Sequence, residues 1–146
     1  MKKIELTNSI VINRKPEDVF TYAINPDKAK EWRLGLLAVT KVKGRPIKEG
    51  SVIEESVEVM GITMHSRTEV VSFKKNKKRE LKIKLGSSVR INMTEKYKEK
   101  DGKTVLIING SAKLKGVQQL LSKTISHQMQ TQLEQEMANL KTNLEA

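Results

Sequence analysis

The chain contains no cysteine, which excludes disulfide bonds, thiolate metal sites and cysteine nucleophiles. This absence suits a reducing compartment, and we expect a cytoplasmic protein. No apolar run approaches the ~18 residues that a membrane-spanning helix needs. The basic start, Lys2 and Lys3, has no apolar stretch behind it and does not resemble a signal peptide. The sequence therefore predicts a soluble chain without a transmembrane segment.

Acidic residues are in deficit, since 28 Lys and Arg against 17 Asp and Glu give a formal net charge of +11. The basic residues are spread along the chain, and many alternate with apolar ones, as on the solvent face of a sheet. Aromatic residues make up only 3% and lysine outnumbers arginine, whereas base stacking and bidentate base recognition favour aromatics and arginine. We expect no specific nucleic-acid partner and at most weak association with anionic surfaces.

A two-residue turn at Met60 and Gly61 would fix the register of one hairpin. The facing pairs are then Val59–Ile62, Val57–Met64, Glu55–Ser66 and Ile53–Thr68 on one face, with Glu58–Thr63, Ser56–His65 and Glu54–Arg67 on the other. The first face is mainly apolar and the second is polar, and a slip of one residue would destroy this agreement. We expect an ion pair between Glu54 and Arg67 on the polar face.

A second hairpin is predicted around Asp101 and Gly102, which form a preferred type I′ turn. The facing pairs on its apolar side are Tyr97–Leu106, Glu95–Ile108, Met93–Gly110, Ile91–Ala112 and Val89–Leu114. Between the hairpins, residues 81–85 alternate apolar and basic side chains, and a turn over 86–88 sets Leu85 against Val89. The sequence therefore predicts five consecutive antiparallel strands with one shared apolar face.

The two ends of the chain show different patterns. A strand is expected over 4–13 and another over 36–43, with two short helices between them that begin at Pro16 and Asn25. After Gly116 the apolar period changes to three or four residues, which predicts a helix of roughly 28 residues. Its apolar stripe comprises Leu121, Ile125, Met129, Leu133, Met137, Leu140 and Leu144.

Several motifs resemble those of the START-like (SRPBCC) superfamily, which includes pollen-allergen relatives and polyketide cyclase/dehydrase-like proteins. The opening strand and the Pro-Glu-Asp-Val-Phe helix start lie within 10–20, and Asn-Pro-Asp at 25–27 is followed by Trp32. A glycine-led strand start lies at 50–53, and 140–145 resembles the end of the family's last helix. The resemblance implies an α+β helix-grip fold, with a seven-stranded curved antiparallel sheet around a long C-terminal helix. It also implies a cavity for lipids, polyketides or similar molecules.

We expect residues 1–146 to form a single ligand-binding domain whose cavity is lined by inward-facing side chains of the sheet and the last helix. The candidates are Glu55, Val57, Met64, Ser66, Thr68, Ile83, Ile91, Met93, Glu95, Tyr97, Ile108, Ile125, Met129 and Leu133. Glu55 and Glu95 interrupt the apolar face, so each needs a partner or a raised pKa. They either hydrogen-bond neighbours such as Ser66 near an open rim, or orient a polar ligand group or act as a general base.

The remaining catalytic inventory is small. His65 falls on the predicted outer face and His127 lies off the helical stripe, so we expect both on the surface. No cluster has metal-ligand spacing, and no motif indicates a cofactor. Binding or carriage of an apolar small molecule is the function that the sequence favours. A cyclase, dehydratase or hydrolase acting on such a molecule is the alternative, and a module that binds a protein or membrane partner is the third.

Overall fold

The computed structural model describes residues 2–146, and the side chains of all of these except 2, 117 and 118. The elements, in chain order, are β1 (Lys2–Ile12), α1 (Pro16–Ile24), the 3₁₀ helix η1 (Pro26–Glu31), β2 (Leu36–Lys43), β3 (Val52–Val59), β4 (Ile62–Lys74), β5 (Lys78–Leu85), β6 (Val89–Lys100), β7 (Lys103–Leu114), the 3₁₀ helix η2 (Gly116–Leu121) and α2 (Ser122–Glu145).

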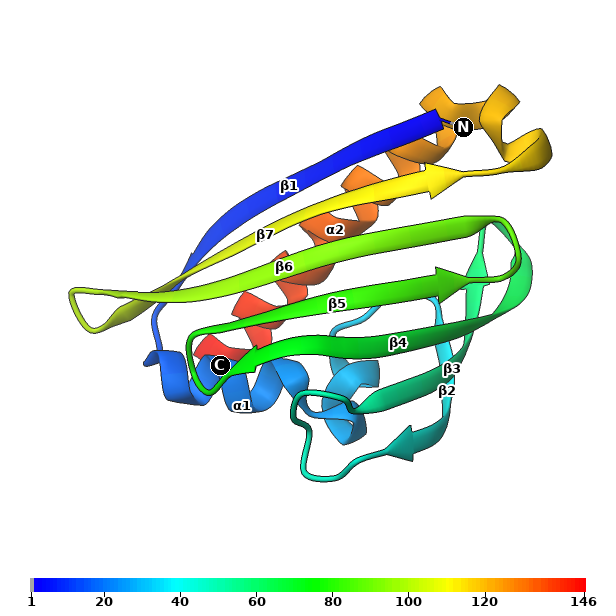
Figure 1. Cartoon of the computed structure of the whole chain (residues 1–146). Coiled ribbons are helices and arrows are strands. Elements are labelled where there is room, and N and C mark those ends of the chain that lie inside the picture. The colour runs from blue at the N-terminus through cyan, green and yellow to red at the C-terminus, as the bar shows by residue number, and fades with distance from the viewer. Residues whose placement is uncertain (1) are drawn as a thin grey trace.

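The seven strands form one antiparallel sheet in the order β1-β7-β6-β5-β4-β3-β2. The sheet curves around α2, which crosses its concave face, while α1 and η1 close one end (Figure 1). This arrangement confirms the predicted helix-grip fold, including the two short helices between the first two strands. Within the described part of the chain, no helix has the length and hydropathy that crossing a bilayer would require.

Both predicted hairpin registers are confirmed. Val57 faces Met64 across the β3–β4 turn, and Ile91 faces Ala112 across the β6–β7 turn. The turn residues Met60 and Asp101 adopt positive φ angles of 52° and 53°, as a type I′ turn requires at its first central position. Because side chains alternate along a strand, this register decides which residues face α2.

Three of the five aromatic residues of the chain pack together. Phe20 of α1 is 2% exposed and contacts Phe73 and Tyr97 edge to face, with ring centroids 5.3 and 5.0 Å apart. Edge-to-face pairs of this kind stabilise a fold beyond the area they bury. They attach α1 to the sheet, and the rest of the core continues along α2 through Leu133, Met137 and Leu140.

The predicted start of the last helix is wrong by about one turn. The α-helix begins at Ser122 and has 24 residues, and the preceding residues 116–121 form a 3₁₀ helix. A 3₁₀ helix has three residues per turn instead of 3.6, so it rotates side chains away from an α-helical stripe. Leu121, predicted on the buried stripe, is 53% exposed.

The expected ion pair between Glu54 and Arg67 does not form, although the two residues face each other as predicted. The Glu54 carboxylate instead lies 3.0 Å from Nε2 of His65, a diagonal neighbour on the same face. Twisted strands bring diagonal side chains within reach of each other. His65 and His127 are both exposed, as predicted.

Gly35 fixes the path of the segment between η1 and β2. Its φ angle is +74°, and a Cβ atom here would lie 2.5 Å from the carbonyl oxygen of Glu58. The two backbones are also hydrogen-bonded here, since the Glu58 N–H donates to the Gly35 oxygen at 2.7 Å. This close approach fixes the backbone directly after Arg33 and Leu34, which border the space between the sheet and α2.

Replacing Gly35 with alanine should lower the free energy of unfolding by about 3 kcal/mol or more, because strain and a backbone clash combine. Gly61→Ala is the matched control, since Gly61 has a φ of +82° but no atom within 4 Å of the added Cβ. That variant should cost only about 1 kcal/mol. Urea denaturation of both variants measures the difference, and equal losses would contradict a specific role for the contact at Gly35.

Candidate functional site

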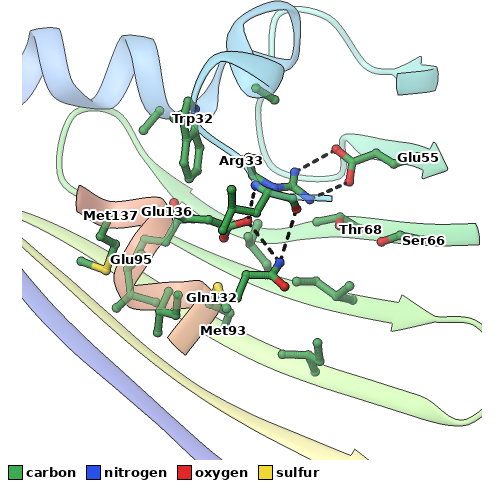
Figure 2. A pocket seen from close by; sticks show the side chains of 18 of the residues that line it. Trp32, Arg33, Glu55, Ser66, Thr68, Met93, Glu95, Gln132, Glu136 and Met137 are labelled. Atoms are coloured by element: carbon green, nitrogen blue, oxygen red, sulfur yellow. Dashed lines mark hydrogen bonds and ion pairs between the residues drawn. The ribbon is translucent and has the colours of Figure 1, made fainter. Parts of the chain in front are cut away.

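A cavity of about 230 Å³ lies between the concave face of the sheet and α2, with η1 at one side. Most of its lining is apolar and comes from strands β3 to β7 and from the α2 segment between Met129 and Leu140. Trp32, at the end of η1, also borders it (Figure 2). The helix-grip fold therefore encloses space where a more tightly packed core would fill it.

All but two of the predicted lining residues border this cavity. They are Glu55, Val57, Ser66, Thr68, Ile83, Ile91, Met93, Glu95, Tyr97, Ile108, Met129 and Leu133. For the ten residues on strands, this position follows from the pairing registers, which turn alternate side chains toward α2. Met129 and Leu133 lie on α2 itself.

Met64 and Ile125 do not line the cavity. Ser66 pairs with Leu85, the last residue of β5, so Met64 lies beyond the end of β5 and packs with Ala29, Leu36 and Val57. Ile125 lies about one helical turn before Met129, where α2 packs against the main core. Both side chains were assigned correctly to the apolar face but lie beyond the end of the cavity.

Arg33 and Glu55 form a two-pronged ion pair in the cavity wall (Figure 2). Nη1 and Nη2 of Arg33 donate to the two carboxylate oxygens of Glu55 at 3.0 and 3.1 Å. The Glu55 side chain is only 6% exposed. Such parallel bonds are both stronger and more specific in geometry than single neutral ones. The pair joins the segment after η1 to the middle of β3.

Arg79 and Glu95 form a second pair, deeper in the protein. Nε and Nη2 of Arg79 donate to Glu95 at 2.7 and 3.3 Å, and the Tyr97 hydroxyl donates to the same carboxylate at 2.9 Å. Both charged side chains are less than a tenth exposed. The third nitrogen of the guanidinium, Nη1, is buried and has no acceptor. A buried donor without a partner is costly.

Glu136 of α2 completes the polar part of the lining. Its carboxylate accepts the Leu34 backbone N–H at 2.9 Å and a Gln132 amide N–H at 3.2 Å, and it lies 4.0 Å from Nε of Arg33. Burial raises the pKa of Glu136, and the positive charge of Arg33 opposes this only in part. The proton therefore stays on this carboxyl to a higher pH than on an exposed glutamate.

The ion pairs also set the pKa values of their neighbours. Burial, the largest single effect, would lower the pKa of Arg33 and of Arg79. The Coulomb attraction and the hydrogen bonds of Glu55 and Glu95 act in the opposite direction, and the pKa of each arginine is raised on balance. Burial, followed by the charge of Glu95, raises the pKa of Tyr97 well above its usual value. The arginines are therefore charged and the tyrosine is a neutral hydrogen-bond donor at physiological pH.

The expectation that Glu55 and Glu95 face inward with partners agrees with this geometry, but the partners were missed. Ser66, the suggested neighbour of Glu55, is not its partner. The sequence did indicate Arg79 as the partner of Glu95. Extending the predicted pairing of Leu85 with Val89 along β5 sets Arg79 opposite Glu95. Arg33 lies outside any periodic element, so no pattern indicated it.

Among residues 2–146, no group of three or more His, Asp or Glu side chains is arranged to hold a metal ion. The charged groups of the cavity wall are the two ion pairs, Arg33 with Glu55 and Arg79 with Glu95, together with Glu136. The chemistry that this arrangement offers is hydrogen bonding and charge recognition inside an apolar enclosure.

The sequence profile of a family described as polyketide cyclase/dehydrase and lipid transport matches residues 3–145. The chain belongs to this family. No curated protein matches it in sequence.

Solved structures share the fold of this family member at low sequence identity. Protein CV1439 from Chromobacterium violaceum is 11% identical, with a TM-score of 0.77 and 97% of each chain covered. The di-domain ARO/CYC BexL from the BE-7585A biosynthetic pathway is 13% identical, with a TM-score of 0.81 over 99% of this chain and 50% of BexL. Ara h 8.0201 is 10% identical, with a TM-score of 0.70 and 98% of each chain covered.

Replacing Glu95 with glutamine should lower the free energy of unfolding by about 3–5 kcal/mol, because the buried charge of Arg79 loses its counter-ion. The double variant Arg79→Met/Glu95→Leu removes both charges and should regain most of that loss. Glu99→Gln changes an exposed carboxylate on the same strand and should stay within about 0.5 kcal/mol of the wild type. Urea denaturation of all variants provides the test, and a double variant as unstable as Glu95→Gln would contradict the pairing.

The raised pKa of Glu136 predicts a defined pH dependence. The folded chain holds this proton more tightly than the unfolded chain, so its stabilising effect is complete below the ordinary value of 4.5 and is lost as pH rises through the raised pKa. The stability of the wild type relative to Glu136→Gln should therefore fall as pH increases above 4.5. Urea midpoints of the two chains across this range measure it, and a difference that stays flat or grows would be inconsistent with a buried carboxyl here.

Proposed function

We propose that the chain binds or carries a small, mostly apolar molecule, a lipid, a polyketide or a similar compound, in the cavity between the sheet and α2. The observation that carries the proposal is a largely apolar cavity with two ion-paired arginines in its wall, of which Arg79 is buried and Arg33 is partly exposed. Ligand sites commonly combine apolar linings with a few fixed polar groups in this way. The family description, which names both polyketide chemistry and lipid transport, supports the same class of ligand.

The polar groups narrow the chemistry of the ligand. The positive charges of Arg33 and Arg79 are already balanced by Glu55 and Glu95. An anionic ligand would therefore find no unpaired cation among the described residues of the cavity wall. A ligand whose only polar group is a neutral oxygen, such as a ketone or ester, fits this lining better than an ion does, because an ion would enter without a counter-charge. The volume of about 230 Å³ is below the roughly 300–1,000 Å³ of drug-sized sites, which favours a small ligand.

Three further statements stay predictions. They are that the lining residues contact the ligand, that residues 1–146 form a single domain, and that the protein is cytoplasmic.

The alternative function is a cyclase, dehydratase or hydrolase acting on such a molecule. Glu136 favours it, because this carboxyl borders the cavity beside Arg33 and retains its proton to higher pH, as a general acid must. Incubation of the chain with the molecule that copurifies with it tests the alternative. A new product in the wild type and none with Glu136→Gln would favour an enzyme, and an unchanged molecule would favour a carrier.

Binding is tested with 2-acetylnaphthalene, a neutral probe whose ketone oxygen is an acceptor and which the basic surface does not attract. Ile83→Trp fills the cavity and should weaken binding by at least about tenfold, while Lys82→Trp adds the same bulk on the exposed face and should leave it unchanged. Equilibrium dialysis gives the dissociation constants.

Trp32 offers a second readout in the wild type, because the only tryptophan of the chain borders the cavity. Its emission should change as the probe binds. Thermal unfolding must first establish that both tryptophan variants are folded. Equal probe affinities in the two folded variants would contradict the cavity as the binding site.

A further inference from the structure

A continuous row of basic residues crosses the outer face of the sheet. The pairing register sets Lys3 opposite Lys113, Lys113 opposite Arg90, Arg90 opposite Lys84 and Lys84 opposite Arg67. We refer to these five residues, which span β1, β7, β6, β5 and β4, as the basic row. Neighbours of these residues along the strands, such as Ile4, Val89, Ile91 and Leu114, are buried in the core, so the row faces away from α2.

The charges of the basic row reinforce one another. Adjacent strands are about 4.8 Å apart, which is shorter than the Debye length of about 8 Å at physiological salt. Only Lys3 has an acidic partner within 4.0 Å in the described part of the chain, namely Glu5 at 3.4 Å. Like charges placed directly opposite each other destabilise a sheet. The basic row therefore does not stabilise the sheet, and its positive potential is available to an anionic partner.

Exposed apolar side chains lie at the same end of the molecule. Leu120 and Leu121 of η2 are 87% and 53% exposed, and Met60 and Ile62 at the β3–β4 turn are 53% and 59% exposed. Antiparallel pairing brings the start of β1, the end of β7 with η2, and the β5–β6 and β3–β4 turns to one end of the sheet (Figure 1). Large exposed apolar residues beside cations are typical of surfaces that meet lipid.

We propose that this end of the molecule docks on an anionic lipid membrane. The basic row attracts the phosphates of the head groups, and Leu120 and Leu121 enter the boundary between head groups and acyl chains. The apolar side chains select lipid over nucleic acid, since a phosphodiester backbone offers them no apolar phase and the row has no aromatic residue to stack on bases. This proposal stands on the outer surface and does not depend on what the cavity binds.

Vesicle flotation at physiological salt tests the proposal. The wild type should bind vesicles of phosphatidylcholine with phosphatidylglycerol and should not bind phosphatidylcholine alone. Lys84→Gln/Arg90→Gln/Lys113→Gln should weaken binding by about tenfold or more, since each cation near an anionic bilayer contributes several-fold. Leu120→Ser/Leu121→Ser should also weaken it, with no change in net charge.

The matched control removes three charges from the opposite end of the same face, where Lys74 faces Lys78 and Lys78 faces Lys96. Lys74→Gln/Lys78→Gln/Lys96→Gln should change vesicle affinity by less than about threefold, because only the end that carries the leucines meets the membrane. Equal losses in the two charge variants would overturn the proposal in favour of net charge alone. Failure of the wild type to bind the anionic vesicles would also overturn it. So would tighter binding to duplex RNA that the leucine substitutions leave unchanged.

Discussion

The ion pair between Arg33 and Glu55 joins parts of the chain that secondary structure alone does not connect. Arg33 follows the end of η1, and Glu55 lies in the middle of β3. Their two parallel hydrogen bonds of 3.0 and 3.1 Å hold these two segments together. Glu136 extends the connection to α2 through the Leu34 backbone N–H. The sheet, the short helices and the long helix are therefore held together by polar contacts around the cavity. The carboxylates of Glu55 and Glu136 are only 6% and 12% exposed, so each needs its partner in place.

The second pair, Arg79 with Glu95 and Tyr97, explains how an apolar interior tolerates a further charge. Each oxygen of the Glu95 carboxylate has a donor, so the cost of its burial is offset locally. The positive charge of Arg79 also acts on Arg33, whose pKa it lowers against the larger effect of Glu55. The polar groups thus form one electrostatic unit whose charges are nearly balanced. An interior of this kind combines apolar contact for most of a ligand with donors at fixed positions.

The fold was largely predictable from the sequence because its registers depend on local turn chemistry. Met60-Gly61 and Asp101-Gly102 fix which side chains of four strands face inward, and this is why Val57, Ile91 and Glu95 were assigned to the correct face. The site was predictable only where it follows strand periodicity. Arg33 sits after a 3₁₀ helix without periodic pattern, and Glu136 lies beside the apolar stripe of α2. The ends of the cavity, which exclude Met64 and Ile125, depend on where β5 stops and α2 begins.

The central claim is that the cavity holds a small, mostly apolar molecule. Native mass spectrometry of the freshly purified chain tests it most directly, followed by extraction and identification of any released compound. The account predicts a complex heavier than the bare chain and a released molecule that is mostly hydrocarbon and carries a ketone, ester or similar oxygen. A chain that carries nothing and takes up no apolar compound from a mixed lipid extract would contradict it.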